Sequence, residues 1–297
     1  MNKEERSAVI AILVTILVTI LVGFLVGWAG SQGSVLVGGL PLFGLLVALA
    51  YLIQWLVFIP AFLLKTEKFF DLTGSITYIT VTILAVLLNG RYDPRSLLTA
   101  ALVIIWAGRL GTFLFRRVLK AGEDKRFTEM KQSFWLFLRT WTLQGLWVTF
   151  TLAAALAIFS ARESVPLGAF AIAGTLIWAL GFGFEAAADR QKQVFRKDPA
   201  NNGKFIRSGL WAWSRHPNYF GEIVLWIGVA VIALPVLAGW RWVALISPVF
   251  VALLLTRISG VPLLEKRADA KWGGQPEYEA YKAATPVLVP RPPKIEN

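Results

Sequence analysis

Residues 8–28 read AVIAILVTILVTILVGFLVGW, a run of 21 residues without one charged side chain. A helix needs about 20 predominantly apolar residues to cross the hydrocarbon core of a bilayer. The run is longer than the apolar region of a signal peptide, and residues 27–30 (GWAG) make a weak cleavage site. We therefore expect residues 8–28 to form a membrane helix that the protein retains.

Seven further stretches meet the same criterion. They are residues 40–64, 73–89, 97–117, 134–159, 166–188, 219–237 and 241–258. The composition agrees, because only 16% of the 297 residues are charged, whereas soluble domains carry about 25%. Most of these stretches are apolar on every side, and none shows the alternation of barrel strands. The sequence predicts an all-α, polytopic membrane helix bundle of about eight transmembrane helices.

Basic residues are distributed unequally between the two sides of such a bundle. With eight helices, 24 of the 30 Lys and Arg residues fall on the side of both termini. The four on the other side are Arg91, Arg95, Arg162 and Arg241. Because cytoplasmic loops carry the excess of basic residues, we expect both termini in the cytoplasm of a multi-pass protein, in a bacterial inner membrane.

The composition also excludes several kinds of site. The chain has no cysteine, which rules out disulfides, thiolate metal sites and Cys nucleophiles, and its one histidine is too few for a histidine metal cluster. No basic stretch forms a recognisable nucleic-acid module. The net charge of +12 can serve topology, anionic lipid or an anionic ligand. The expected partners are a hydrophobic small molecule and membrane lipids, with no metal and no nucleic acid.

Polar side chains gather at the end of the predicted span 166–188. Glu185 and Asp189 are four residues apart, and Gln193 and Arg196 continue the same helical face. Charged groups in a membrane span are functional candidates because burying them is costly. Two interpretations stay open: a helix end solvated by water, or one polar wall of a ligand site.

Arg109 lies about two turns inside the predicted span 97–117. Its long side chain can reach the membrane interface, or its guanidinium can face an anionic ligand. Gln54, inside the span 40–64, is a further polar candidate.

Asp71 and Tyr78 are seven residues apart and share a face at the start of the predicted span 73–89. Asp71 can serve as a helix N-cap, and Tyr78 can be interior packing with a hydrogen-bonded hydroxyl. The functional alternative is that the Tyr78 hydroxyl donates a proton to a substrate.

Residues 208–222 read SGLWAWSRHPNYFGE and run into the predicted span 219–237. Proline disfavours helical geometry in the residue before it, here His216, while Pro217 suits the first turn of a helix. Arg215, His216 and the free N–H groups of a helix N-terminus form a combination that attracts phosphate.

Asn218, Glu222 and Trp226 recur every four residues on one face of this helix. A carboxylate one turn into the helix can accept hydrogen bonds from ribose hydroxyls or an amide, and Tyr219 can stack on a ring. The alternative is a Trp-rich interfacial loop with a snorkelling arginine. The polar tail that follows Arg257 is expected to close over a cytoplasmic ligand.

These residues carry a resemblance to a known family. The run 208–222, and SGVPLLEKR at 259–267, resemble the steroid 5-alpha-reductase-like family of bacterial membrane proteins. The wider group includes sterol C14-reductases, and its C-terminal half is similar to isoprenylcysteine carboxyl methyltransferases. The resemblance is specific over residues 180–290 and weaker over 65–126, through FDLTGS and GRLGTFLFRR. It implies NADPH bound from the cytoplasmic side and reduction of a polarised carbon–carbon double bond in a hydrophobic, steroid- or enone-like lipid.

The resemblance also implies roles for individual residues. The cofactor contacts that it carries over are Asp189, Arg196, Asn218, Glu222, Trp226 and Arg257. The other cofactor-binding candidates are Arg109, Glu185, Arg215, His216 and Tyr219. The known reductases have seven helices and polarise the steroid carbonyl with a Glu and a Tyr from early helices, a pair without a clean match here. Tyr78, with Asp71 nearby, is our catalytic candidate, chosen from its depth and its side of the membrane.

The predicted organisation combines these observations. Residues 1–64 form N-terminal transmembrane helices, and 65–297 form a reductase-like membrane domain with cytoplasmic cofactor-binding loops at 189–221 and 257–290. The predicted function is that of an NADPH-dependent oxidoreductase acting on CH–CH groups, in lipid metabolism. Two alternatives stay open: a membrane methyltransferase that uses S-adenosylmethionine, and a non-enzymatic lipid-binding or transport protein. Methyltransferases of this type usually carry Glu-Glu where this chain has Glu265-Lys266.

Overall fold

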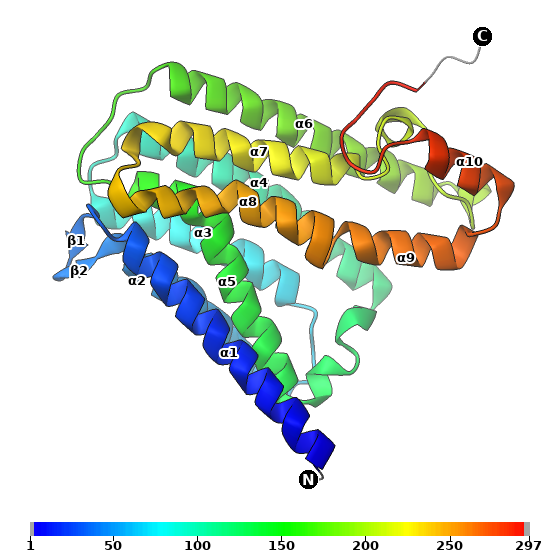
Figure 1. Ribbon diagram of the computed structural model, residues 1–297, viewed down its shortest axis with the longest axis horizontal. Coiled ribbons are helices and arrows are strands. Elements are labelled where there is room, and N and C mark those ends of the chain that lie inside the picture. The colour runs from blue at the N-terminus through cyan, green and yellow to red at the C-terminus, as the bar shows by residue number, and fades with distance from the viewer. Residues whose placement is uncertain (1–2, 294–297) are drawn as a thin grey trace. The chain divides into compact units, whose positions relative to one another are not determined.

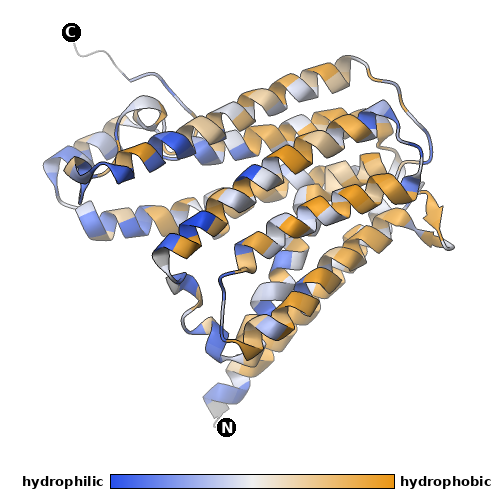
Figure 2. Cartoon of the chain, turned by 180° about the vertical axis from the view of Figure 1, so that it is seen from behind, coloured by the Kyte–Doolittle hydropathy of each residue, from blue (hydrophilic) through white to orange (hydrophobic). Residues whose placement is uncertain are grey.

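A computed structural model describes residues 3–293, so the outermost residues of the predicted ranges 1–64 and 65–297 lie outside it. Within 3–293, eight helical segments are long and apolar enough to cross a membrane. This finding confirms the predicted number of spans and the all-α class. Figure 2 shows hydrophobic residues over most turns of these helices, and they indicate a multi-pass membrane protein.

The spans follow one another along the chain (Figure 1). The first seven are α1 (Lys3–Gly30), α2 (Leu42–Leu63), α3 (Phe70–Asn89), α4 (Pro94–Ala121), α5 (Phe134–Phe159), α6 (Ala169–Lys197) and α7 (Pro217–Ala233). The last comprises a 3-10 segment, η6 (Gly239–Leu245), then α8 (Ile246–Leu253), a π-helical turn, η7 (Leu254–Ile258), and α9 (Val261–Trp272). Helix α10 (Pro276–Ala284) comes after it.

The last span is therefore irregular at both ends of α8. After the π-helical turn that follows α8, the N–H groups of Ser259 and Gly260 both donate to the carbonyl oxygen of Leu254, at 2.9 and 3.4 Å. A Cβ on Gly260 would clash with the backbone carbonyl oxygen of Leu255 and would lie 2.9 Å from Cε2 of Tyr219, so only glycine fits this bend. Arg257 lies on the π-helical turn, a kind of turn that is frequent at functional sites.

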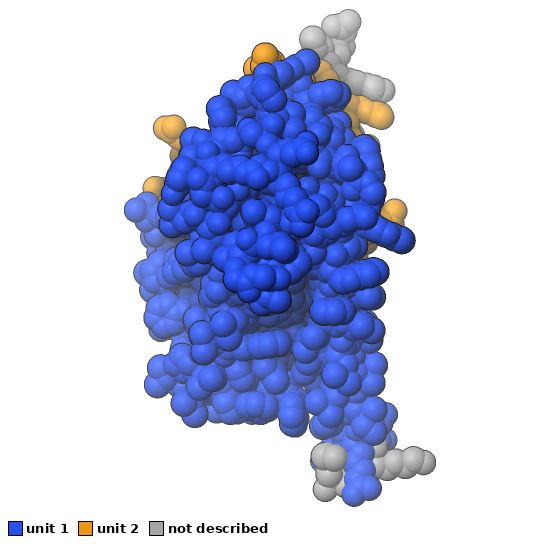
Figure 3. All heavy atoms as spheres, turned by 90° about the vertical axis from the view of Figure 1, so that its left-hand side faces the viewer, with its two compact units in different colours: residues 1–171, 232–247 blue, residues 172–231, 248–297 orange. Residues whose placement is uncertain are grey.

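The chain divides into two compact units, coloured separately in Figure 3. Unit 1 comprises residues 1–171 and 232–247, and unit 2 comprises residues 172–231 and 248–297. The domain division predicted from the sequence at residue 64 stays a prediction.

Helix α5 is the central element of unit 1 and packs against α1, α2 and α3. Its residues 153–157 are Ala-Ala-Ala-Leu-Ala and are almost fully buried, because small side chains let neighbouring helices come close. At Gly145, an added Cβ would lie 2.9 Å from Cδ1 of Tyr51 on α2. The Tyr51 hydroxyl donates to the carbonyl oxygen of Thr19 on α1, at 3.0 Å. This one tyrosine of α2 thus contacts both α1 and α5.

A two-residue hairpin joins α1 to α2. Strand β1 (Leu36–Val37) pairs antiparallel with β2 (Leu40–Pro41). The two turn residues, Gly38 and Gly39, both have positive φ, 58° and 82°, as tight hairpin turns of this kind require. Ser34 forms an isolated bridge with Ala161, beyond the end of α5.

A buried carboxylate in the α2–α3 connection is hydrogen-bonded to the α4–α5 connection. Glu67 is 3% exposed and accepts hydrogen bonds from Nζ of Lys131, at 2.7 Å, and from the backbone N–H of Asp124, at 2.9 Å. Burial acts to raise the pKa of the Glu67 carboxyl, but these hydrogen bonds outweigh it and hold the pKa below its usual value.

In unit 2, glycines bring the backbones of α6 and α7 into direct contact. A Cβ added to Gly221 would lie 2.5 Å from the backbone N of Glu185 and the backbone O of Gly181. One added to Gly228 would lie 2.6 Å from the backbone N of Trp178. The bare backbone at these positions allows the polar end of α6 to lie against the first turns of α7.

Candidate functional site

The polar end of α6 meets α7 through a side-chain hydrogen bond. Nδ2 of Asn218, in the first turn of α7, donates to Oδ1 of Asp189, at 3.2 Å. Asp189 and Glu185 are 7% and 2% exposed. Glu222 and Trp226 follow Asn218 at intervals of one helical turn, and Trp226 is buried. The structure thus brings Asp189 and Asn218 together, with Glu185 one turn away on α6.

This group of side chains is rich in hydrogen-bond acceptors. Two carboxylates and an amide oxygen can accept from the hydroxyls of a ribose or the N–H groups of a carboxamide. Burial raises the strength of such hydrogen bonds because the local dielectric is low. The arrangement is therefore suited to binding a polar, hydroxyl-bearing ligand.

Arg215 and His216, which precede α7, converge on a residue that the sequence analysis did not select. Nε2 of His216 lies 2.7 Å from Oε1 of Glu265 on α9, and Nη1 of Arg215 lies 3.2 Å from Oε2 of the same carboxylate. The His216 ring also stacks on Tyr219, with centroids 5.7 Å apart and an interplanar angle of 9°. Their predicted contact with phosphate stays a prediction, whereas their pairing with Glu265 is a property of the structure.

The signal for Glu265 was present in the sequence, since it lies in the second motif, 259–267. Its partner could not be named because the two motifs are about 50 residues apart in the chain and meet only through the fold.

The C-terminal segment after α10 lies along the loop that precedes α7. The N–H of Arg215 donates to the carbonyl oxygen of Pro286 at 2.9 Å, and the N–H of Arg291 donates to that of Trp213 at 2.9 Å. The hydroxyl of Ser214, which is fully buried, donates to the carbonyl oxygen of Leu288 at 2.8 Å. The tail, which we expected to close over a ligand, is thus hydrogen-bonded to the loop of the Arg-His-Pro motif.

Arg196 and Arg257 are both exposed on unit 2. Arg196 follows Asp189 by two helical turns on α6, and Arg257 lies on η7. Their exposure leaves the two guanidinium groups accessible to an anionic ligand. Whether they share one ligand with Asp189 and Asn218 stays a prediction.

A cavity of about 510 Å³ lies along a different face of α6. Arg190, Gln191 and Val194 are among its lining residues, and Oε1 of Gln191 accepts a hydrogen bond from the N–H of Leu210 at 2.9 Å. Helical geometry turns these positions away from Glu185, Asp189 and Arg196. None of the predicted site residues lines this cavity.

The remaining three predicted site residues, Asp71, Tyr78 and Arg109, belong to unit 1. Asp71 lies in the first turn of α3, and its Oδ2 is 3.5 Å from Nη2 of both Arg117 and Arg126. This carboxylate is thus part of an ion-pair network in the structure. Its predicted catalytic role stays a prediction.

Tyr78 packs edge-on against Trp106 of α4, with centroids 5.1 Å apart and an interplanar angle of 79°. This contact agrees with the packing interpretation and leaves the catalytic one open. Arg109, on the same helix as Trp106, is half-buried. Its position is compatible with either interpretation made from the sequence.

Polar side chains in the interior of unit 1 make hydrogen bonds that the sequence revealed only in part. Gln54 is fully buried, and its Nε2 donates to Oγ1 of Thr77 at 2.7 Å. Gln144 on α5 donates to the carbonyl oxygen of Phe70 at 3.0 Å. Gln144 was missed, although a glutamine inside an apolar span is the same signal that selected Gln54.

Within residues 3–293, no group of three or more His, Cys, Asp or Glu side chains is placed to hold a metal ion. This finding concerns side-chain clusters only.

Three curated proteins show local similarity to the chain. A steroid 5-alpha-reductase (DET2) of Gossypium hirsutum is 36% identical over 72 residues, which is 24% of this chain and 26% of the relative. A probable O-methyltransferase (ustE) of Ustilaginoidea virens is 36% identical over 58 residues, 20% of each chain. The 3-oxo-5-alpha-steroid 4-dehydrogenase 1 of Rattus norvegicus is 27% identical over 159 residues, 49% of this chain and 56% of the relative. The chain thus spans between a fifth and little more than half of these relatives.

No solved structure matches the chain. The model of one protein family, described as "Protein of unknown function (DUF1295)", matches residues 57–285. This range begins in the last two turns of α2 and includes every later helix. The chain therefore belongs to the DUF1295 family.

Proposed function

We propose that this protein is a membrane-embedded reductase that uses NADPH to reduce a carbon–carbon double bond in a hydrophobic, enone-like lipid. The observation that supports it most is the contact between α6 and α7, where Asp189 and Asn218 are hydrogen-bonded beside the buried Glu185. The similarity to a steroid 5-alpha-reductase and a 3-oxo-5-alpha-steroid 4-dehydrogenase supports the reaction class.

The donor set fits a phosphorylated dinucleotide. Buried carboxylates and an amide suit the ribose hydroxyls and the carboxamide, and the exposed guanidinium groups of Arg196 and Arg257 suit phosphates. In this proposal Glu185, Asp189, Asn218 and Glu222 hold the sugar and carboxamide groups. The set contains no glycine-rich loop between a strand and a helix, so the binding mode differs from that of a Rossmann fold.

When bound, NADPH supplies a hydride to the β-carbon of the substrate. The protein positions the reactants and stabilises charge. In the proposal, the Tyr78 hydroxyl donates a hydrogen bond to the carbonyl oxygen, where negative charge develops, and the α-carbon takes up a proton from water to complete the reduction. Asp71 supports the start of α3 through its ion pairs with Arg117 and Arg126.

Substitutions in the polar group test the cofactor site. We expect Glu222→Ala and Arg196→Ala to weaken NADPH binding about tenfold or more, because each removes a hydrogen bond to a charged group. Arg190→Ala is the matched control, since Arg190 is an exposed arginine on another face of α6. The measurement is NADPH affinity of the detergent-purified variants. Unchanged affinity in both Glu222→Ala and Arg196→Ala would overturn the proposed site.

A second candidate is a methyltransferase that uses S-adenosylmethionine, because one relative is named a probable O-methyltransferase. A thermal-shift measurement of the wild-type protein with NADPH, NADH and S-adenosylmethionine separates the two. Stabilisation by S-adenosylmethionine alone favours the methyltransferase, whereas stabilisation by NADPH supports the reductase. No stabilisation by any of the three favours a non-enzymatic lipid-binding protein.

A further inference from the structure

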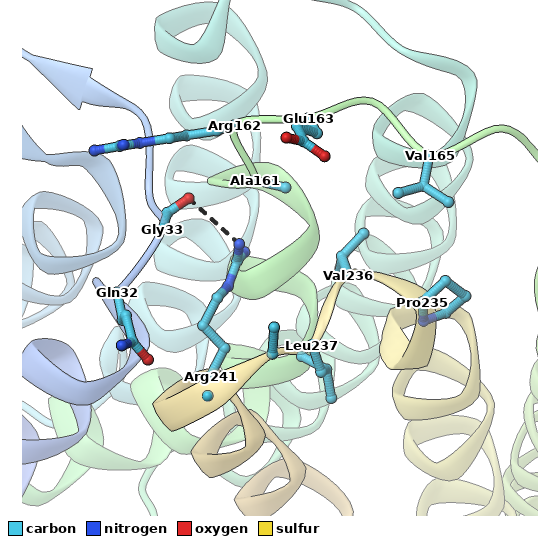
Figure 4. A pocket seen from close by; sticks show the side chains of 12 residues that line it. Gln32, Gly33, Ala161, Arg162, Glu163, Val165, Pro235, Val236, Leu237 and Arg241 are labelled. Carbon is cyan, nitrogen blue, oxygen red and sulfur yellow. Dashed lines mark hydrogen bonds between the residues drawn. The ribbon is translucent and has the colours of Figure 1, made fainter.

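A second cavity, of about 430 Å³, lies entirely within unit 1, at the end where α1 and α5 finish. Figure 4 shows its lining, which comes from the residues after α1, the segment after α5, and the segment that runs from Pro235 into the start of η6. Three charged side chains line it: Arg162, Glu163 and Arg241. The proposed function uses none of them.

Arg241 is a buried cation in this cavity. It is 6% exposed, and its guanidinium donates only to backbone carbonyl oxygens, those of Ala157 and, at 3.5 Å, of Gly33 (Figure 4). Its Nε–H has no acceptor in the part of the chain that the structure describes, and no carboxylate among those residues lies within 4.0 Å of it. Glu163, although it lines the same cavity, is exposed and does not pair with Arg241.

Arg95 provides a comparison within the same unit. It is equally buried, at 2% exposed, but its Nε, Nη1 and Nη2 donate to the carbonyl oxygens of Val165, Ile232 and Pro166, at 3.2, 2.6 and 2.7 Å. Arg95 does not line the cavity and acts as a structural link between chain segments. Arg241, in contrast, lines the cavity, and its buried Nε–H has no acceptor among the described residues.

The buried charge of Arg241 would be stabilised by a counter-ion. A buried charge without a partner is costly, and it is normally paired or hydrogen-bonded. The carbonyl oxygen of Ala157, in the last turn of α5, offsets part of this cost because helix C-termini carry partial negative charge. Arg162, whose Nε donates to the carbonyl oxygen of Ser34 at 2.9 Å, adds a second positive charge to the lining. Within residues 3–293, Glu163 is the one carboxylate of the lining, so its charged side chains keep a net positive charge, and the cavity favours an anionic group.

Exposed tryptophans indicate the depth of the cavity in the membrane. Trp240 and Trp242, on either side of Arg241, are 66% and 50% exposed, and Trp28 near the end of α1 is 65% exposed. Exposed tryptophans gather at the level of the lipid headgroups. The phosphate groups of phospholipids lie at the same level.

We propose that this cavity binds a phosphate group through Arg241, with Arg162 as a second positive charge. The phosphate belongs either to a phospholipid headgroup or to a free anion, since both present the same chemistry to a guanidinium. The proposal is independent of the reductase function.

The test compares binding to the detergent-purified protein by native mass spectrometry. The probes are dioleoylphosphatidylglycerol, inorganic phosphate and, as an uncharged lipid, dioleoylglycerol. We expect one phosphatidylglycerol or one phosphate per wild-type chain and no retained dioleoylglycerol. Phosphatidylglycerol alone identifies the headgroup as the source, and phosphate alone identifies a free anion.

Two variants and a control locate the site. Arg241→Gln removes the charge, and Ala238→Phe adds bulk to the cavity lining from an exposed position while keeping the Arg241 side chain. We expect each to lower retention of the bound probe about tenfold or more. Ala101→Phe, at an exposed position on α4, should leave it unchanged. Equal retention of phosphatidylglycerol and dioleoylglycerol, binding of neither phosphate probe, or wild-type retention by the folded Ala238→Phe variant would each overturn the proposal.

Discussion

The groups that pack against glycines in helix contacts differ between the two units. In unit 1 the space at a glycine is occupied by a side chain from another helix: Gln144 lies over Gly74, and Tyr51 lies over Gly145. In unit 2 the space at Gly221 and Gly228 is occupied by the backbone of α6. A side chain can change rotamer to make room, but the backbone of a packed helix cannot move without separating the helices.

The difference shows which contact the proposed site depends on. In unit 2 the separation of α6 and α7 sets the hydrogen bond between Asp189 and Asn218, so one methyl group between the backbones acts on the site directly. In unit 1 polar side chains join the elements, and each can be removed separately. Substitutions in the two units therefore test this difference, and we expect them to lower the free energy of unfolding by different amounts.

The largest effect is expected for Gly221→Ala. The added methyl group would lie 2.5 Å from backbone atoms of Glu185 and Gly181, so α6 and α7 must move apart. We expect a loss of about 3 kcal/mol in the free energy of unfolding, and a loss of NADPH binding if the proposed site is correct. Thermal unfolding in detergent measures the first effect. A Gly221→Ala variant as stable as the wild type would show that the two backbones are not in contact.

Glu67→Gln should have the next largest effect, a loss of about 2 kcal/mol in the free energy of unfolding, because it removes the charge of a buried carboxylate from two hydrogen bonds. The pKa of Glu67 is lower in the folded chain than its usual value. Its contribution is therefore present above the usual pKa of a glutamate and is lost as the pH falls through the folded-state pKa.

The pH dependence is measured by comparing unfolding of the wild type and Glu67→Gln between about pH 7 and pH 3. The wild type should be more stable at neutral pH, and the difference should shrink on acidification. A difference that does not change with pH would refute the role of this carboxylate.

For Gly74→Ala we expect a smaller loss, about 1 kcal/mol, in the free energy of unfolding. Its methyl group would lie 2.6 Å from Nε2 of Gln144, so the glutamine must give up its hydrogen bond to Phe70 but the helices can stay in place. The double variant Gly74→Ala/Gln144→Ala tests this reason, because it should lose less stability than the sum of the two single variants. A loss as large as that of Gly221→Ala would break the distinction between the two units.

Gly183→Ala should have the smallest effect and the opposite sign. Gly183 is an interior residue of α6 with nothing within 4 Å of an added Cβ. Alanine has the higher helix propensity, so we expect the free energy of unfolding to rise by about 0.5 kcal/mol. The variant is also the matched control for Gly221→Ala. Destabilisation by Gly183→Ala would mean that glycine on α6 serves flexibility and not packing.

The eight spans could be predicted because each is a property of its own residues. The run 8–28 exceeds the length needed to cross a bilayer whatever the rest of the chain does. The irregular last span could not be predicted, because its apolar pattern is the same for α-, 3-10 and π-helical turns. At Gly260 an added Cβ would meet the backbone of Leu255 in the same span, and also the ring of Tyr219, about 40 residues earlier in the chain, a neighbour that only the fold supplies.

The candidate site was predicted in part. The polar face of α6 and that of α7 followed from helical spacing, and the structure joins them through Asp189 and Asn218. The spacing did not show that Arg215 and His216 share the carboxylate of Glu265. It also did not separate Arg95 from Arg241, which look equivalent in the sequence but have different partners.

The sequence by itself determined the class of protein, the number of its spans and the uneven distribution of its basic residues. These properties depend on the free energy of transferring each residue from water to lipid, which sums over the residues of a single segment. Only the tertiary structure decided which glycines carry a backbone contact, which carboxylate receives His216, and which buried arginine keeps an unused donor. Such outcomes depend on groups far apart in the chain that meet at a few ångströms, a distance that no local pattern encodes.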